Sequence, residues 1–123
     1  MSAAGTIARL RAARQSWVEL EPGKRVQILR PAEAELQDFY TRPDQTEVDR
    51  ALMCARKYVT GWEGVTEADL LGPEIAAADP VPFDSDLWAE VVKDRVAWLE
   101  VVTHALLAAI RKHQAAQEAD AKN

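Results

Sequence analysis

The segment from Val96 to Ile110 constrains the fold most, because nearly every residue in it is apolar. Only Glu100, Thr103 and His104 are polar there, and at helical spacing these three fall on one narrow face. A helix that is apolar over the rest of its surface is normally buried on several sides. The segment therefore predicts either the central helix of one small domain or a helix that docks partly on another subunit.

The length and charge of the chain favour a single small domain over residues 1–123. The chain has 123 residues, of which 48% are hydrophobic, and a formal net charge of -5. The longest apolar run, 105–110, is too short to span a bilayer, and the N-terminus lacks the apolar region of a signal peptide. With 20 acidic and 15 basic residues, an extended nucleic-acid surface is not expected. We expect 1–15 to be a flexible arm or a short helix and 114–123 to be a frayed tail.

Strict alternation of apolar and polar residues predicts a β-hairpin near the N-terminus, with strands at about 17–20 and 25–30. The apolar side chains of the two strands share one face only if an odd number of residues separates the strands. We therefore predict a three-residue loop at 22–24 that pairs Leu20 with Val26. Two strands are not stable alone in water, so the hairpin must pack on the helices or on another chain.

The remaining pattern is helical, so the fold class is mainly α with a minor β part. A central helix is expected over 45–60, with Asp44 as its N-cap, and two C-terminal helices over about 85–93 and 95–117. The Gly- and Pro-rich stretch 61–83 connects them, and connections of this length are often functional.

The chain contains Asp, His and Cys residues of the kinds used in catalysis and metal binding, but their spacing does not fit a catalytic or metal site. Helix capping accounts for Asp84 and Asp86, and His104 and His113 are nine residues apart, so they do not share a helix face. The lone Cys54 fits a small core residue. We therefore expect a non-enzymatic protein with no catalytic residue, no metal and no cofactor.

Four tryptophans are the unusual feature of the composition, at positions 17, 62, 88 and 98. Trp62 and Trp98 fit a core role, whereas Trp17 opens an edge strand and is expected to be partly exposed. A partly exposed tryptophan is a good anchor for a protein partner. The candidate partner-binding residues are Trp17, Trp62, Phe83, Trp88, Leu106 and Ile110.

Several short strings occur in order between about residues 16 and 112. They are Trp17-Val18-Glu19-Leu20, Gly23-Lys24-Arg25-Val26, Arg30-Pro31 followed by Glu33 and Glu35, Val59-Thr60-Gly61-Trp62-Glu63-Gly64-Val65, Val81-Pro82-Phe83, Leu87-Trp88 and the run from Ala105 to Ile110. This order resembles the small tail assembly chaperones of long-tailed bacteriophages and prophages. The stretch from Glu67 to Asp79 is longer than the glycine-centred spacer of that pattern.

The resemblance implies an assembly factor of the bacterial host cytoplasm that binds the tape measure protein. Such a factor keeps the long apolar helices of the tape measure protein soluble and helps to recruit tail tube subunits. Association of the chain with copies of itself is a further alternative. One alternative is a structural virion component, either a minor tail protein or a head–tail joining protein. Another is a small regulatory domain that contacts nucleic acid through Arg9, Arg11 and Arg14.

Overall fold

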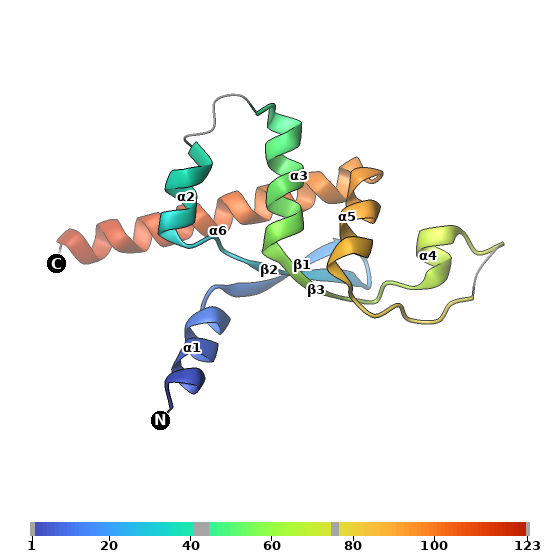
Figure 1. Cartoon of the computed structure of the whole chain (residues 1–123), viewed down its shortest axis with the longest axis horizontal. Coiled ribbons are helices and arrows are strands. Elements are labelled where there is room, and N and C mark those ends of the chain that lie inside the picture. Colours follow the sequence, from blue (N-terminus) through green and yellow to red (C-terminus); the bar gives the residue numbers. More distant parts are fainter. Residues whose placement is uncertain (1, 41–44, 75–76, 123) are drawn as a thin grey trace.

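A computed structural model describes residues 2–40, 45–74 and 77–122, and in it the chain is mainly helical with one three-stranded antiparallel sheet (Figure 1). The sheet has the strand order β1-β2-β3. The elements, in chain order, are α1 Ala3–Ala12, β1 Gln15–Glu21, β2 Lys24–Leu29, α2 Glu33–Tyr40, α3 Glu47–Tyr58, β3 Val59–Glu63, α4 Glu67–Leu71, α5 Ser85–Lys93 and α6 Val96–Lys122.

The predicted hairpin is confirmed, but the three-residue loop and the pairing of Leu20 with Val26 are wrong. Strands β1 and β2 are joined by a two-residue turn, with Glu21 opposite Lys24, and a β-bulge lies between Glu19 and Glu21. The bulge takes up one extra residue of β1, so Val18 and Val26 face each other on the apolar side. The extra residue that keeps the apolar side chains of both strands on one face therefore lies in β1 and not in the loop.

The third strand was not predicted from the sequence. Helix α3, expected over 45–60, ends at Tyr58, and β3 begins at the next residue and pairs with β2. The N-cap of α3 is Thr46, whose side chain accepts a hydrogen bond from the Asp49 backbone N–H. The expected cap, Asp44, lies outside the described residues.

The core lies between one face of the sheet and helices α3, α5 and α6. Helix α6 buries one face only, and the break expected near Asp94 is present between α5 and α6. The buried residues of this core are Leu20, Val26, Ile28, Ala55, Tyr58, Val59, Trp62, Val65, Trp88, Val92, Trp98, Leu99, Val102 and Leu106. Helix α6 is therefore covered by its own chain along this face.

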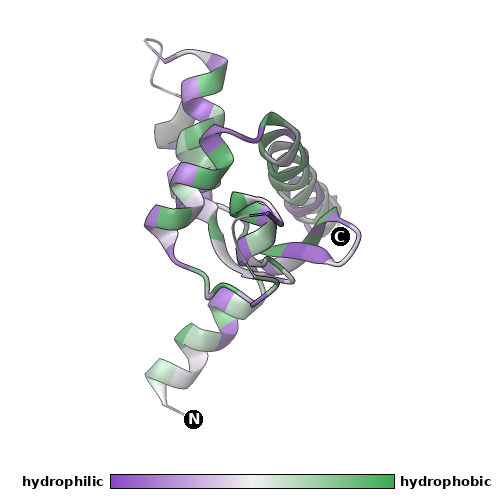
Figure 2. Cartoon of the chain, turned by 90° about the vertical axis from the view of Figure 1, so that its right-hand side faces the viewer, coloured by the Kyte–Doolittle hydropathy of each residue, from purple (hydrophilic) through white to green (hydrophobic). Residues whose placement is uncertain are grey.

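The two ends of the chain lie away from this core. Of the two alternatives for the N-terminal segment, the structure has the short helix, and α1 buries no residue and projects from the body (Figures 1 and 2). At the other end, residues 114–122 continue α6 and are all exposed, so fraying there stays a prediction. Among the described residues, no helix has the length and apolar character needed to cross a bilayer.

Candidate functional site

A groove between helices α3 and α5 is a candidate functional site. It has a volume of about 550 Å³, within the range of ligand-binding clefts. Residues of both helices line it: Leu52, Met53, Arg56, Lys57, Ser85, Ala89, Val92 and Lys93. None of these residues was among the partner-binding candidates from the sequence.

The groove has an apolar floor and a cationic rim. Val92 is fully buried and Leu52, Met53 and Ala89 are partly buried, whereas the side chains of the three basic lining residues are more than half exposed. Each cation has a carboxylate partner, at N–O distances of 3.5 Å for Arg56–Asp86, 2.9 Å for Lys57–Glu35 and 2.8 Å for Lys93–Glu90. The pairs of Arg56 with Asp86 and of Lys93 with Glu90 are exposed and contribute little stability, so an incoming carboxylate can replace Asp86 and Glu90 at small cost.

Trp88 sets the spacing of the two groove helices. Its side chain is fully buried, and the indole N–H donates to the backbone carbonyl of Ala55 at 2.9 Å. That carbonyl is one of the last four of α3, which have no partner within the helix. Trp62 packs edge-on against Trp88, with ring centroids 6.4 Å apart. Helix α5 is therefore fixed to the C-terminal end of α3.

A polar cluster around Glu35 of helix α2 holds the end of the groove near Lys57. Tyr58 donates its hydroxyl to Glu35 Oε2 at 3.0 Å, and the Ala32 backbone N–H donates to Oε1 at 3.0 Å. Burial raises the pKa of the Glu35 carboxyl, but the hydrogen bonds from Lys57, Ala32 and Tyr58 outweigh it and leave the pKa below its ordinary value. Burial and Glu35 raise the pKa of Tyr58 to about 12, so the hydroxyl stays a donor at neutral pH.

The partner-binding residues predicted from the sequence divide into buried and accessible ones. Trp62, Trp88, Leu106 and Ile110 are buried and fill the interior of this chain, so in this conformation they are not exposed to a partner. Phe83 is half-buried, with its ring 5.5 Å from that of Trp62 in an edge-on arrangement. Trp17 is 39% exposed on the sheet, where the Arg25 guanidinium lies 4.4 Å from its ring. Trp17 therefore has the partial exposure that was predicted for it.

The side chains considered for catalysis or metal binding have structural roles or lie in environments that make them unreactive. Asp84 caps α5 by accepting hydrogen bonds from the backbone N–H groups of Asp86 and Leu87, both at 3.0 Å. Burial raises the pKa of the Cys54 thiol to about 11, so the thiol stays protonated at neutral pH. Within residues 2–40, 45–74 and 77–122, no three His, Cys, Asp or Glu side chains are grouped to hold a metal ion.

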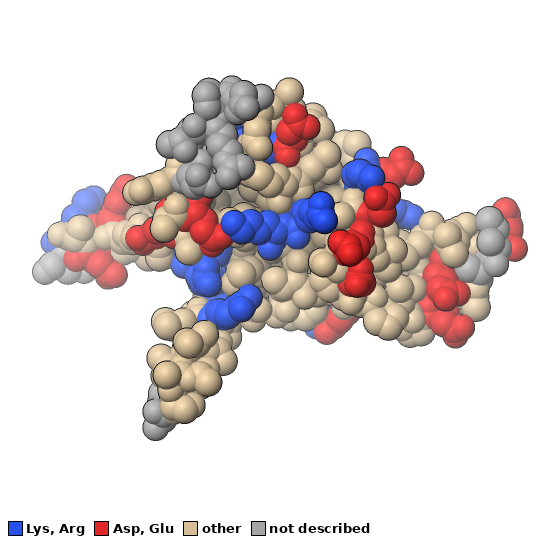
Figure 3. Space-filling view, viewed as in Figure 1, with Lys and Arg blue, Asp and Glu red and all other residues tan. Residues whose placement is uncertain are grey.

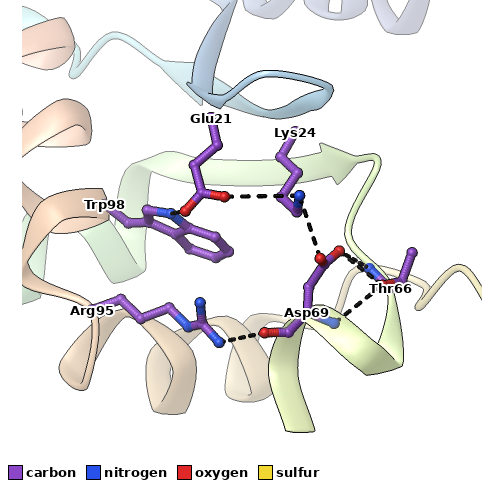
Figure 4. Close-up of polar contacts among 6 residues, drawn as sticks. All are labelled: Glu21, Lys24, Thr66, Asp69, Arg95 and Trp98. Atoms are coloured by element: carbon purple, nitrogen blue, oxygen red, sulfur yellow. Dashed lines mark hydrogen bonds and ion pairs between the residues drawn. The ribbon is translucent and has the colours of Figure 1, made fainter. Parts of the chain in front are cut away.

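A second polar network ties α4 to the hairpin turn and to the start of α6 (Figure 4). The Asp69 carboxylate accepts from the Thr66 backbone N–H at 2.8 Å, and the Asp69 backbone N–H donates to the Thr66 hydroxyl at 3.1 Å, so the two residues form a capping box. The Lys24 ammonium lies 3.3 Å from Asp69 Oδ1, and Arg95 donates to the Asp69 backbone carbonyl. On the same side, the Trp98 indole donates to Glu21 at 3.0 Å. These contacts fix the position of α4 on the body.

Replacing Asp69 with asparagine is expected to lower the free energy of unfolding by about 1 kcal/mol at pH 7, because the capping box and the contact with Lys24 are weakened. Burial raises the pKa of the Asp69 carboxyl, but the hydrogen bonds from Thr66 and the charge of Lys24 lower it by more. The pKa of Asp69 in the folded chain is therefore below its ordinary value. The stability from the ionised carboxylate is therefore present above the unfolded pKa of about 3.9 and is lost as the pH falls through the lower folded pKa. Urea unfolding of both proteins from pH 7 to pH 3 checks this; a constant difference would contradict it.

Comparison with family models, curated proteins and solved structures finds no match to this chain.

Proposed function

We propose that this chain is a non-enzymatic tail assembly chaperone of a bacteriophage or prophage, and that it binds a helix of the tape measure protein in the α3–α5 groove. The observation that carries the proposal is the apolar floor of the groove with a rim of three cations. That combination fits an amphipathic helix that places its apolar face in the groove and its acidic side chains against the rim.

Binding of this kind supplies what the proposed activity needs. A helix laid between α3 and α5 covers Leu52, Met53 and Ala89 and hides its own apolar face from water. The acidic side chains of the bound helix replace Asp86 and Glu90 as partners of the rim cations. The chain thereby keeps an otherwise aggregation-prone helix soluble until the tail tube subunits assemble.

The strings that resemble the chaperone family support the proposal because the fold brings several of them together. Those at 17–20, 23–26 and 59–65 contribute to the three paired strands, and the backbone carbonyl of Val81 accepts the Trp62 indole N–H at 2.7 Å. The Leu87-Trp88 string belongs to α5, one wall of the groove. These strings thus build the frame that positions the groove.

Replacing Ala89 with arginine is expected to reduce binding of the tape measure protein by at least about 10-fold, or ~1.4 kcal/mol, because the larger side chain fills the groove. The measurement is co-expression of the tagged full chain with the tape measure protein encoded beside it, followed by quantification of soluble retained protein. The matched control is Ala97→Arg, at an exposed position of α6 outside the groove lining, which should bind like the parent.

A second variant separates loss of binding from loss of folding. Lys93→Gln removes one rim charge at an exposed side chain and is expected to weaken binding with little change in the thermal midpoint, since the lost Lys93–Glu90 pair is exposed. A tape measure protein that stays insoluble beside the parent chain, or a gene neighbourhood without one, would contradict the proposal. Finding the chain in purified particles would favour a structural virion component instead, because assembly chaperones leave before completion.

A further inference from the structure

Helix α1 presents an apolar face that no part of the described chain covers. None of its residues is buried, and Ile7 and Leu10, three residues apart on one face, are 58% and 63% exposed. A helix of this length has little stability in water without tertiary packing, since isolated helices below ~12–15 residues are marginal. The helix therefore gains most from a surface that covers Ile7 and Leu10.

The α1 segment is also the basic end of an acidic chain. Residues 2–14 contain Arg9, Arg11 and Arg14 and no acidic residue, although the whole chain has a net charge of -5. Arg11 is four residues after Ile7, so it lies on the same helix face as Ile7 and Leu10. The surface that covers this face should thus be apolar at its centre and acidic around it.

The α4 protrusion, which consists of residues 65–74 and 77–81, has an exposed apolar residue with acidic residues around it. Leu71 is 60% exposed, and the exposed Glu67 lies one helical turn before it. Residues 65–81 contain four acidic residues, Glu67, Asp69, Glu74 and Asp79, and no basic one, and Asp69 is paired with Lys24 of the hairpin turn. Figure 3 shows acidic side chains on this protrusion and basic ones where α1 joins the body.

The protrusion is held firmly enough to act as a docking surface. Its helix is capped by Thr66 and Asp69 and tied to Lys24 and Arg95 (Figure 4). The returning chain is paired with it through the Glu67 N–H to the Asp79 carbonyl at 3.1 Å and the Val81 N–H to the Val65 carbonyl at 2.9 Å. Binding to this surface therefore requires little ordering of the backbone.

Helix α1 and the α4 protrusion lie on opposite sides of the body, so they are not placed to meet within one molecule (Figure 1). We propose that α1 of one copy of this chain docks on the α4 surface of a second copy, with Ile7 and Leu10 against Leu71 and Arg11 against Glu67. The two surfaces differ, so the contact is head-to-tail and its repetition gives rings or filaments. This inference goes beyond the proposed function and does not depend on it.

The experiment uses two full-length variants that each break one half of the contact. Leu10→Glu places an acid opposite the acidic surface, and Leu71→Ser removes the apolar contact of α4 without adding a charge that would attract the Leu10→Glu variant; both positions are exposed, so folding should be preserved. In sedimentation and light-scattering measurements we expect the parent chain to form species larger than a dimer. Each variant alone should be monomeric, and their equimolar mixture should form a 1:1 dimer, because one intact α1 meets one intact α4 surface.

The control is Val48→Glu, a change of the same kind at a residue that is 63% exposed on α3, which should assemble like the parent. Assembly of the parent should weaken as salt is raised from roughly 0.15 M to 1 M, since the charge attraction is screened. A monomeric parent, an assembly unaffected by Leu10→Glu, or variants that do not combine in the mixture would overturn the proposal. So would a monomer whose α1 binds duplex DNA in an Arg11-dependent manner.

Discussion

Replacing Gly64 with alanine is expected to lower the free energy of unfolding by about 4 kcal/mol, a large part of the ~5–15 kcal/mol available to a domain. Gly64 has a φ of 79°, where a side chain is strained by about 1–2 kcal/mol. A Cβ atom there would also lie 1.8 Å from the backbone carbonyl oxygen of Gly23. Since backbone and not a flexible side chain is in the way, the hairpin turn and the α4 segment must move apart.

Equilibrium urea unfolding of the full chain measures this effect. The matched control is Gly23→Ala, because Gly23 has a similar φ of 84° but no atom within 4 Å of the position of a Cβ. The control should lose only the strain of about 1–2 kcal/mol. Equal midpoints for the two variants would show that the close approach of Gly64 to the turn is not required.

Replacing Trp88 with alanine is expected to lower the free energy of unfolding by about 3–5 kcal/mol, the usual range for loss of a buried tryptophan. The side chain is fully buried, so its removal leaves a cavity between α5 and the rest of the core. The substitution also removes the donor to the Ala55 carbonyl and the edge-on contact with Trp62. A buried carbonyl without a partner adds roughly 1 kcal/mol or more to the loss.

Two further variants separate these contributions in the same unfolding measurement. Trp88→Phe keeps an aromatic ring but removes the indole N–H, and should cost about 1–2 kcal/mol. Trp17→Ala removes a tryptophan that is 39% exposed and should cost less than ~1 kcal/mol. If Trp88→Ala costs no more than Trp17→Ala, Trp88 is not the contact that fixes α5 to α3.

The sequence was sufficient for the elements whose signal is local. The break at Asp94 between the two C-terminal helices and the odd residue in the hairpin follow from nearby residues, and both are present. Strand β3 was missed because Val59 and Trp62, three residues apart, continue the helical spacing of α3. Its partner β2 lies far away along the chain, so no local pattern distinguishes this strand from one more turn of helix.

The candidate site was less accessible to sequence reasoning than the fold. The groove depends on how α3 and α5 lie against each other, and its lining includes Met53, Arg56 and Ala89, none of which has a distinctive spacing. The cations beside the apolar stripe of α3 were the available signal. Large aromatic residues serve both cores and interfaces, so the residue type alone did not separate the buried Trp88 from the exposed Trp17.

The direct passage from α3 into β3 at Tyr58 and Val59 has a consequence for the folding kinetics. A hairpin such as β1–β2 forms within microseconds, whereas β3 must first close the long loop back to β2. If β3 pairs one residue out of register, Trp62 turns away from the core, and α3 is pulled along because no loop lies between them. Misaligned pairings therefore lose helix packing and strand packing together. We expect them to dissociate quickly, so that the sheet and the helices complete folding in one cooperative step.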